Sequence, residues 1–382
     1  MLFRKQQLKK FFLSIILLLL ILLLSIFIFT SCSSSFGNPP TEEKQKEYEK
    51  SPNFHDGTFH NIKKVNPPPS FFKMMGILWD MMLNDNITIP EKTFQVMPFN
   101  ISTWDSIPTN QFAMSWLGHS TIIMKVNGKN IITDPVFSER VSPVSFSGPK
   151  HFSYSHRLNL NDLPTIDVVL ISHDHYDHLD EEVIKQLSKT KTKFYVPLGV
   201  ESHLQFWGVD TNNIVCSDWW QDFNYNDQIQ FAFVPSQHFS GRGLTDRMCT
   251  LWGSWIIKTK ENNIFFSGDS GYHKEFKTIG EKYGPFDITF IECGAYNKEW
   301  KDIHMFPEQS YQAALDLNSS VVMPIHWGKY NLAMHNWYEP VEKIKTASIG
   351  KSSQLITPEI NMIFLPKTQQ PQTNWWKNYK QP

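Results

Sequence analysis

The sequence predicts an α/β domain, and three features of the chain support that prediction. From residue 112 onward, short apolar runs typical of strands alternate with turns and a few helical stretches. Four of the runs are apolar almost throughout, as expected for strands buried on both faces, and they cover 165–172, 228–237, 262–268 and 319–325. No internal repeat interrupts the sequence, so we expect a single domain over residues 100–367.

The composition argues against two classes of protein. The chain has 382 residues and a formal net charge of −1, so it lacks the basic balance of a nucleic-acid-binding protein. Its four cysteines are widely spaced and form no CxxC pair. This excludes a disulfide framework and a zinc-ribbon site.

Residues 1–31 have the pattern of an export signal. Four basic residues in "MLFRKQQLKK" precede an uncharged apolar run over 11–29. The stretch "FTSC" resembles a bacterial lipobox, in which Cys32 is lipidated and becomes the mature N-terminus, although Phe29 stands where an aliphatic residue is usual. The alternative is an uncleaved transmembrane anchor, for which the run is long enough. Both outcomes predict a membrane-anchored protein of the bacterial cell envelope, outside the cytoplasm.

Three further segments flank the predicted domain. Residues 32–50 are polar and charged, and we expect a tether there. Residues 51–99 form an extension in which "FFKMMGILWDMML" (71–83) has the apolar spacing of a short helix. Residues 368–382 are a polar tail whose aromatic side chains can pack back on the body.

Each of the four apolar runs ends at a side chain that can bind a metal. These side chains are His173, His238, Asp269 and His326. The carboxyl ends of strands are where α/β sheets build their sites. After the first run, "ISHDHYDHLD" packs three histidines and three aspartates into ten positions. One histidine after a strand is more often structural, but an HxHxDH run with three further strand-end donors indicates a metal site.

The spacing of these donors predicts two metal ions. His173 and His175 lie two residues apart, so an extended loop points both the same way. We expect the first ion to be held by His173, His175 and His238. We expect the second to be held by Asp177, His178 and His326. Asp269 can bridge the pair, because a carboxylate has two oxygens, and such pairs about 3.5–4 Å apart assist hydrolysis. Asp180 is expected to cap the following helix instead.

The "HDHYDH" run together with His238, Asp269 and His326 resembles the metallo-β-lactamase superfamily. The resemblance implies an αββα sandwich of two mixed β-sheets flanked by helices, with a dinuclear site. Six further stretches resemble the branch of phospholipases D that hydrolyse N-acyl-phosphatidylethanolamine. They are "SPNFHDGTFHN", "WLGHST", "ITDPVFSERVSP", "GPKHF", "HMFPEQS" and "MPIHWGKYNLAMHNWYEP". Together they extend from about residue 51 to residue 340.

The resemblance implies a membrane-tethered hydrolase with two zinc ions, or other divalent metals, per chain. Its substrate would be a phospholipid or a small phosphodiester, cleaved to N-acylethanolamine and phosphatidic acid, with no nucleic acid as partner. Asp177, itself a predicted ligand, and His304 are the catalytic candidates. His304 would position the phosphate or protonate the leaving group, or it would help "MFPEQS" begin a helix with Pro307 in its first turn.

Two more side chains carry roles from the resemblance. Asp134 in "ITDP" would orient a ligand histidine, or it is only a turn residue before Pro135. His119 in "WLGHST" would line the site, or it is a buried structural histidine. The basic residues Arg242, Arg247 and Lys329 could meet a phosphate, but exposed basic residues are usually only solvated, and we expect that here.

Three functions compete on this basis. The first is the phospholipase D-type phosphodiesterase, and the second is a hydrolase of another bond, such as a lactonase or β-lactamase. The third is a non-catalytic binding lipoprotein, against which the complete ligand set argues. For the first function, we expect residues 71–83 to contact lipid, because Met and aromatic side chains adapt to acyl chains. The alternative is that this helix only covers the core.

Overall fold

The four predicted apolar runs form strands, each ending shortly before its predicted ligand. They are β6 (Val168–Leu170), β10 (Gln230–Val234), β12 (Asn263–Phe266) and β14 (Ser319–Ile325). The computed structural model describes residues 2–65 and 71–380. Within that part, the four strands belong to two different sheets, with β6 in one and the other three in the second. The ligands therefore come from both halves of the fold.

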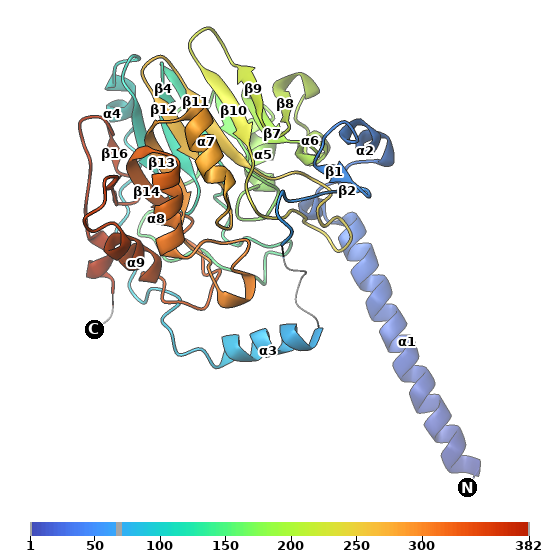
Figure 1. Cartoon of the computed structure of the whole chain (residues 1–382). Coiled ribbons are helices and arrows are strands. Elements are labelled where there is room, and N and C mark those ends of the chain that lie inside the picture. The colour runs from blue at the N-terminus through green and yellow to red at the C-terminus, as the bar shows by residue number, and fades with distance from the viewer. Residues whose placement is uncertain (1, 66–70, 381–382) are drawn as a thin grey trace.

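Each sheet has seven strands and mixes parallel with antiparallel pairs, which confirms the expected sandwich (Figure 1). The first has the order β15-β14-β13-β12-β11-β10-β9, parallel from β12 to β15 and antiparallel elsewhere. Its other members are β9 (Gln221–Asn224), β11 (Ser254–Lys258), β13 (Phe286–Glu292) and β15 (Gln354–Leu355).

The second sheet has the order β16-β3-β4-β5-β6-β7-β8, parallel from β5 to β8 and antiparallel elsewhere. Its other members are β3 (Ala113–Trp116), β4 (Ile122–Val126), β5 (Lys129–Thr133), β7 (Lys193–Pro197), β8 (Ile214–Ser217) and β16 (Ile363–Phe364). Helix α6 (Val200–Phe206) packs on β7 and β8.

Strand β10 shows why the central strands are apolar on both faces. Phe231 and Phe233 point into the core between the sheets, while Ala232 and Val234 point to a second core on the outer face. That outer core is covered by α7 (Glu275–Tyr283), α8 (Pro307–Asp316) and α9 (Glu339–Ala347). Because both faces of the strand are buried, its sequence is a continuous apolar run.

The segment expected to be a free tether is instead folded onto the body. It forms a short 3-10 helix, η1 (Ser34–Phe36), and then α2 (Glu42–Tyr48). Tyr48 is buried against Phe54 and Phe59, and its hydroxyl donates to Glu201 over 2.5 Å. Together with backbone contacts of residues 34–38, Tyr48 packs this polar stretch onto the body, which differs from the tether predicted over 32–50.

The tail after residue 367 also belongs to the folded body. Trp375 and Trp376 in η5 (Trp375–Asn378) are buried, and Trp375 stacks on Trp327 with ring centroids 5.4 Å apart. The aromatic side chains thus pack back on the body, as the sequence allowed. The predicted domain boundary at residue 367 is correspondingly too early.

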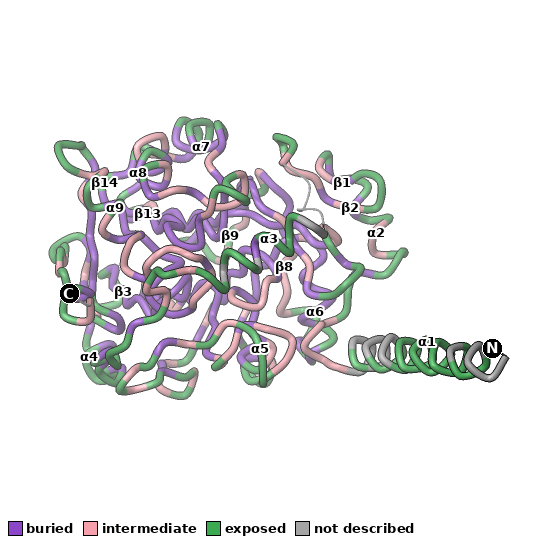
Figure 2. The backbone as a smooth tube through the Cα atoms, turned by 90° about the horizontal axis from the view of Figure 1, so that it is seen from below, coloured by how far each residue is buried: buried purple, intermediate pink, exposed green. Residues whose placement is uncertain are grey.

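Two helices lie outside the layers of the sandwich. Helix α1 (Leu2–Cys32) projects away from the body, and α3 (Phe71–Met82) lies along the side toward which α1 projects (Figure 1). The described parts of α1 are exposed along its length (Figure 2). Among helices of the described residues, none combines the length and apolar character needed to cross a membrane. The Cys32 side chain lies outside the described part, and its lipidation stays a prediction.

Candidate metal centre

A ten-residue stretch between β6 and α5 (Glu181–Leu187) carries four of the predicted ligands. As predicted, Asp180 caps α5, accepting a 3.0 Å hydrogen bond from the backbone N–H of Glu182. Its other oxygen accepts from the N–H groups of Phe137 and Ser138 over 2.9 and 2.8 Å. The ligand loop (residues 173–178) thus follows strand β6 at one end and leads at the other into Asp180, which caps helix α5.

The three histidines predicted for the first ion converge. Nδ1 of His175 lies 2.9 Å from Nε2 of His173 and 3.2 Å from Nε2 of His238. Burial lowers the pKa values of all three imidazoles, so they are neutral and present free nitrogen lone pairs. These are the donor atoms that zinc prefers.

The donors predicted for the second ion form a neighbouring group. Oδ2 of Asp177 lies 3.4 Å from Nε2 of His178 and 3.3 Å from Nε2 of His326. Burial alone would raise the pKa of Asp177, but the histidines around it hold that pKa well below its usual range. The carboxylate is therefore charged.

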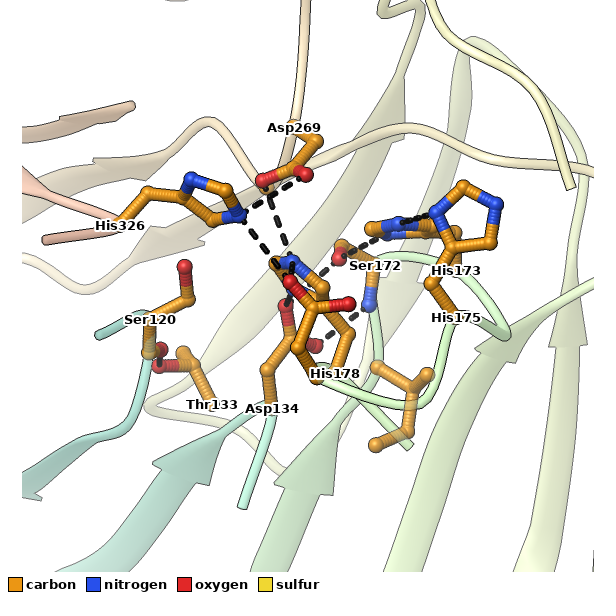
Figure 3. A network of polar contacts seen from close by, with 12 residues as sticks. Ser120, Thr133, Asp134, Ser172, His173, His175, His178, Asp269 and His326 are labelled. Atoms are coloured by element: carbon orange, nitrogen blue, oxygen red, sulfur yellow. Dashed lines mark hydrogen bonds and ion pairs between the residues drawn. The ribbon is translucent and has the colours of Figure 1, made fainter. Parts of the chain in front are cut away.

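Asp269 lies between the two groups (Figure 3). Its Oδ1 is 3.2 Å from Nε2 of His178, and its Oδ2 is 3.0 Å from Nε2 of His326. The same Oδ2 lies 3.8 Å from Nε2 of His238, in the first group. One carboxylate thus faces donors of both groups, as a bridging ligand must.

The residues present fit a pair of divalent metal ions. Nε2 of His178 and Oδ1 of Asp269 are buried, point at one another and make no hydrogen bond. Leaving a buried polar atom unpaired costs about 1–3 kcal/mol, so such atoms need a partner. Donors about 2.0–2.2 Å from a tetrahedral ion lie a little over 3 Å from one another, and the separations here match that spacing. We therefore regard these seven side chains as the ligand cluster.

Asp134 supports the cluster from below. It accepts a hydrogen bond from Nδ1 of His178 over 2.7 Å, and two more from the N–H and hydroxyl of Ser172 over 2.7 and 2.6 Å (Figure 3). Because Nδ1 carries the proton, Nε2 of His178 is free to face Asp269. This geometry favours the orienting role over a mere turn before Pro135.

His119 lies beside the second group of donors. It is buried, and its Nε2 donates to Oδ2 of Asp177 over 3.0 Å. Burial lowers the pKa of His119 to about 3, so the ring is neutral. The structure therefore places this residue against the cluster, as predicted, and there it restrains Asp177.

His304 reaches the site from the loop before α8, where Pro307 begins the helix as predicted. Its Nδ1 lies 3.9 Å from Oδ2 of Asp269 and 3.3 Å from Oε1 of Glu292. Glu292 ends β13, is fully buried, and accepts from the N–H groups of Ser270 and Met305 over 2.9 and 3.2 Å. Burial raises the pKa of Glu292. The sequence analysis missed this residue, although it is a fifth acidic or basic side chain at the end of an apolar run.

A cavity of about 420 Å³ opens above the ligand cluster. His175, Asp177, His238, Asp269, His304 and His326 form its floor. Its walls are largely apolar and include Phe239, Trp300 and Leu332, together with Met74 and Ile77 of α3. The helix expected from residues 71–83 is thus a wall of the site.

The three basic residues differ from the prediction. Only Arg247 lines the cavity, with its guanidinium 4.2 Å from the centre of the Phe239 ring. Arg242 and Lys329 are buried, which contradicts the expectation of solvated side chains. Lys329 donates to the carbonyl of Val136 over 2.7 Å, and burial lowers its pKa to about 7. Backbone carbonyls replace water around both cations, a role that the sequence pattern does not reveal.

Comparison with known proteins matches residues 129–327 to the Beta-lactamase superfamily domain. An uncharacterized protein of Mycobacterium tuberculosis is 38% identical over 338 residues, covering 86% of this chain and 88% of its own. N-acyl-phosphatidylethanolamine-hydrolyzing phospholipase D 1 of Caenorhabditis elegans is 35% identical over 258 residues, covering 64% of this chain and 72% of its own. The mitochondrial enzyme of the same name from Saccharomyces cerevisiae is 33% identical over 240 residues, covering 60% and 50%.

Solved structures agree on the fold. Igni18, a metallo hydrolase from Ignicoccus hospitalis, superposes with a TM-score of 0.51 at 21% identity, covering 66% of this chain and 97% of its own. A possible metal-dependent hydrolase from Veillonella parvula gives a TM-score of 0.54 at 13% identity, covering 67% and 99%. At these identities the likeness concerns the sandwich alone.

Proposed function

The chain belongs to the metallo-β-lactamase superfamily and is a metal-dependent hydrolase, and from this premise we propose that it hydrolyses N-acyl-phosphatidylethanolamine. The products are N-acylethanolamine and phosphatidic acid. The observation that carries the proposal is the apolar cavity above the ligand cluster, walled in part by α3. Two relatives that share a third of their aligned residues with this chain bear the name of that activity.

The cavity suits a phospholipid with an anionic centre. Its floor gathers metal donors, and its walls supply Met74, Phe239 and Leu332, which can contact acyl chains. Arg247 provides a positive charge at the wall, where it can pair with the phosphate. A polar metabolite would leave these apolar walls wet, so the lining favours a lipid.

The mechanism assigns separate tasks to the residues of the site. The seven side chains of the ligand cluster would hold divalent ions, which would supply a nucleophilic water at neutral pH and offset negative charge on the phosphoryl group. Water adds to phosphorus, and the bond from phosphorus to the ethanolamine oxygen breaks. His304 faces the cavity beside Asp269 and gives that oxygen its proton. Glu292 lies 3.3 Å from Nδ1 of His304, the same nitrogen that faces Asp269, and supports the imidazole there.

We further propose that the two ions are zinc and that the protein is held at the membrane of the cell envelope. Two adjacent donor groups that share Asp269 support a pair of ions. Neutral imidazoles and carboxylates are zinc donors. The uncharged run over 11–29 and the "FTSC" stretch support the membrane location.

A product assay tests the proposal. The purified full chain is given N-acyl-phosphatidylethanolamine vesicles, a lactone and a β-lactam, each with and without zinc. We expect equal amounts of N-acylethanolamine and phosphatidic acid, with zinc required. Asp269→Asn should abolish turnover, because an amide bridges two cations poorly, whereas Asp105→Asn on exposed α4 (Ile101–Ser106) should not. Hydrolysis of the lactone or the β-lactam without phospholipid turnover would refute the lipid substrate.

A further inference from the structure

Arg242 binds the backbone of the ligand loop and is not among the residues that line the cavity. Its guanidinium is buried, with only 5% of the residue exposed. One terminal nitrogen, Nη1, donates to the backbone carbonyl of Asp174 over 2.7 Å and to that of Leu179 over 2.9 Å. These two carbonyls bracket residues 175–178, which contain three of the predicted ligands. Arg242 therefore fixes the two ends of the stretch that presents them.

The same guanidinium also binds the segment that joins α1 to the body (residues 33–38, the junction segment). Nε and Nη2 donate to the backbone carbonyl of Ser35 over 3.1 and 2.9 Å. The N–H groups of a guanidinium form a fork in one rigid plane. The position of the edge that binds Ser35 therefore fixes the position of the edge that binds Asp174 and Leu179. Displacing Ser35 would remove the acceptor for one whole edge of the fork.

Two aromatic rings hold the guanidinium in place. Its central carbon lies 4.1 Å from the ring centre of Tyr176 in the ligand loop and 5.0 Å from that of Trp207. Such cation–π contacts gain strength when water is excluded. The Trp207 indole N–H donates to the carbonyl of Ser34 over 2.9 Å, and the Tyr176 hydroxyl donates to the carbonyl of Arg242. The stack thus joins the junction segment to the ligand loop a second time.

A third connection runs through His203 of α6. Its Nδ1 accepts a 3.0 Å hydrogen bond from the N–H of Asn38, and its Nε2 lies 3.5 Å from Oδ2 of Asp174. The fit is close at Gly37, which has a φ of 71° and where a Cβ would lie 2.1 Å from Nδ1 of His203. Only glycine lets the junction segment dock at this distance.

We infer that Arg242 is a positioning residue for the metal centre, and that the docked junction segment completes its support. The segment that anchors the body to α1 thereby sets the orientation of His175, Asp177 and His178. Residues that hold metal ligands in place typically change metal affinity by about 10–100-fold when they are replaced. This inference rests on the proposed metal role of the ligand loop but not on the substrate.

Zinc affinity of full-length variants, measured by chelator competition, tests the inference. Gly37→Ala should undock the junction segment, and Arg242→Lys should lose the two-edged fork, so each is expected to weaken zinc binding by about 10–100-fold. Gly350→Ala is the matched control, because Gly350 has a φ of 70° but nothing lies within 4 Å of the added Cβ. It carries the same backbone strain without the clash, and its zinc affinity should equal that of the wild type.

Trp207→Phe keeps an aromatic ring beside Arg242 and removes the hydrogen bond to Ser34, so it tests the inference if Gly37→Ala does not fold. We expect weaker zinc binding with an unchanged unfolding temperature of the metal-free protein. A lower unfolding temperature with wild-type zinc affinity would show a merely structural role and overturn the inference. A wild-type chain that binds no zinc would instead refute the metal role in the proposed function, and this inference with it.

Discussion

The carboxylate of Asp134 accepts a 2.7 Å hydrogen bond from Nδ1 of His178, and neither side chain is exposed to solvent. This contact selects the tautomer in which Nε2 of His178 faces Asp269. Burial by itself raises the pKa of Asp134, while the hydrogen bonds from His178 and Ser172 oppose that effect. The orientation of the His178 ring therefore depends on the carboxylate oxygen of Asp134 that accepts this hydrogen bond.

We expect Asp134→Asn to lower activity and zinc affinity by about 10–100-fold, because the amide can turn a donor toward Nδ1 of His178. Elemental analysis of the purified variant should show less zinc than in the wild type. Asp105→Asn makes the same chemical change on the exposed face of α4 and serves as control. Wild-type zinc content and activity in Asp134→Asn would count against the orienting role.

Glu292 offers a test of His304 that leaves the ligand cluster intact. Glu292→Gln removes the charge 3.3 Å from Nδ1 of His304 and keeps an acceptor for only one of the N–H groups of Ser270 and Met305, because these bond to different carboxylate oxygens. We expect kcat to fall about 10-fold or more with unchanged zinc content, since positioned proton donors contribute about 10²–10⁴-fold. A phosphodiester with a nitrophenol leaving group needs no proton donor and should show a smaller loss. An equal loss on both substrates would exclude this role.

Substitutions in helix α3 can distinguish lipid contact from core packing, because some of its side chains are exposed and one is buried. Met75, Trp79 and Met82 are exposed, the last two at 61% and 79%, whereas Ile77 is buried at 7%. Replacing the three exposed side chains with Gln should reduce activity on vesicles several-fold and spare a short soluble phosphodiester. The unfolding temperature should stay constant, and Ile77→Gln should lower it. Equal loss of activity on both substrates would contradict lipid contact. Phe72 and Leu78 also belong to this helix, but their side chains lie outside the described part of the structure.

Lys329 should make stability depend on pH. Burial lowers its pKa to about 7 from the ordinary value of 10.5, so between these values the unfolded chain binds a proton that the native chain does not. The contribution of this lysine to the free energy of unfolding therefore rises from pH 7 to pH 10.5 and is flat below pH 7. Lys329→Met should remove this slope, measured as the difference between wild type and variant in urea unfolding at several pH values. A constant difference would show that the buried lysine does not titrate there.

Mass spectrometry of the mature N-terminus tests the lipid anchor. If "FTSC" is processed as a lipobox, the mature chain begins at a lipid-modified Cys32, and Cys32→Ser leaves the precursor uncleaved. Detection of intact Met1 in the wild-type chain would leave the uncleaved anchor as the explanation of the apolar run.

The ligand cluster could be predicted because its signals are local. His173, His238, Asp269 and His326 each follow an apolar run, and the end of a buried strand is visible within a few residues of sequence. Glu292 obeys the same rule, but it is part of the strand rather than of the loop after it, and nothing local marks it as facing His304. The helix over 71–83 was likewise visible in its spacing, whereas its place as a cavity wall was not.

The order of strands and ligands was already contained in the chain, because strand periodicity and the choice of imidazole and carboxylate donors are properties of short segments. The roles of Arg242 and Lys329 arose only in the folded protein. Their partners are backbone carbonyls of Ser35 and Val136, some two hundred residues away, brought near by the packing of two sheets. A carbonyl is present at every residue and leaves no mark in the sequence. Which carbonyls meet a buried cation is therefore decided by tertiary structure, and here they include the two that hold the ligand loop.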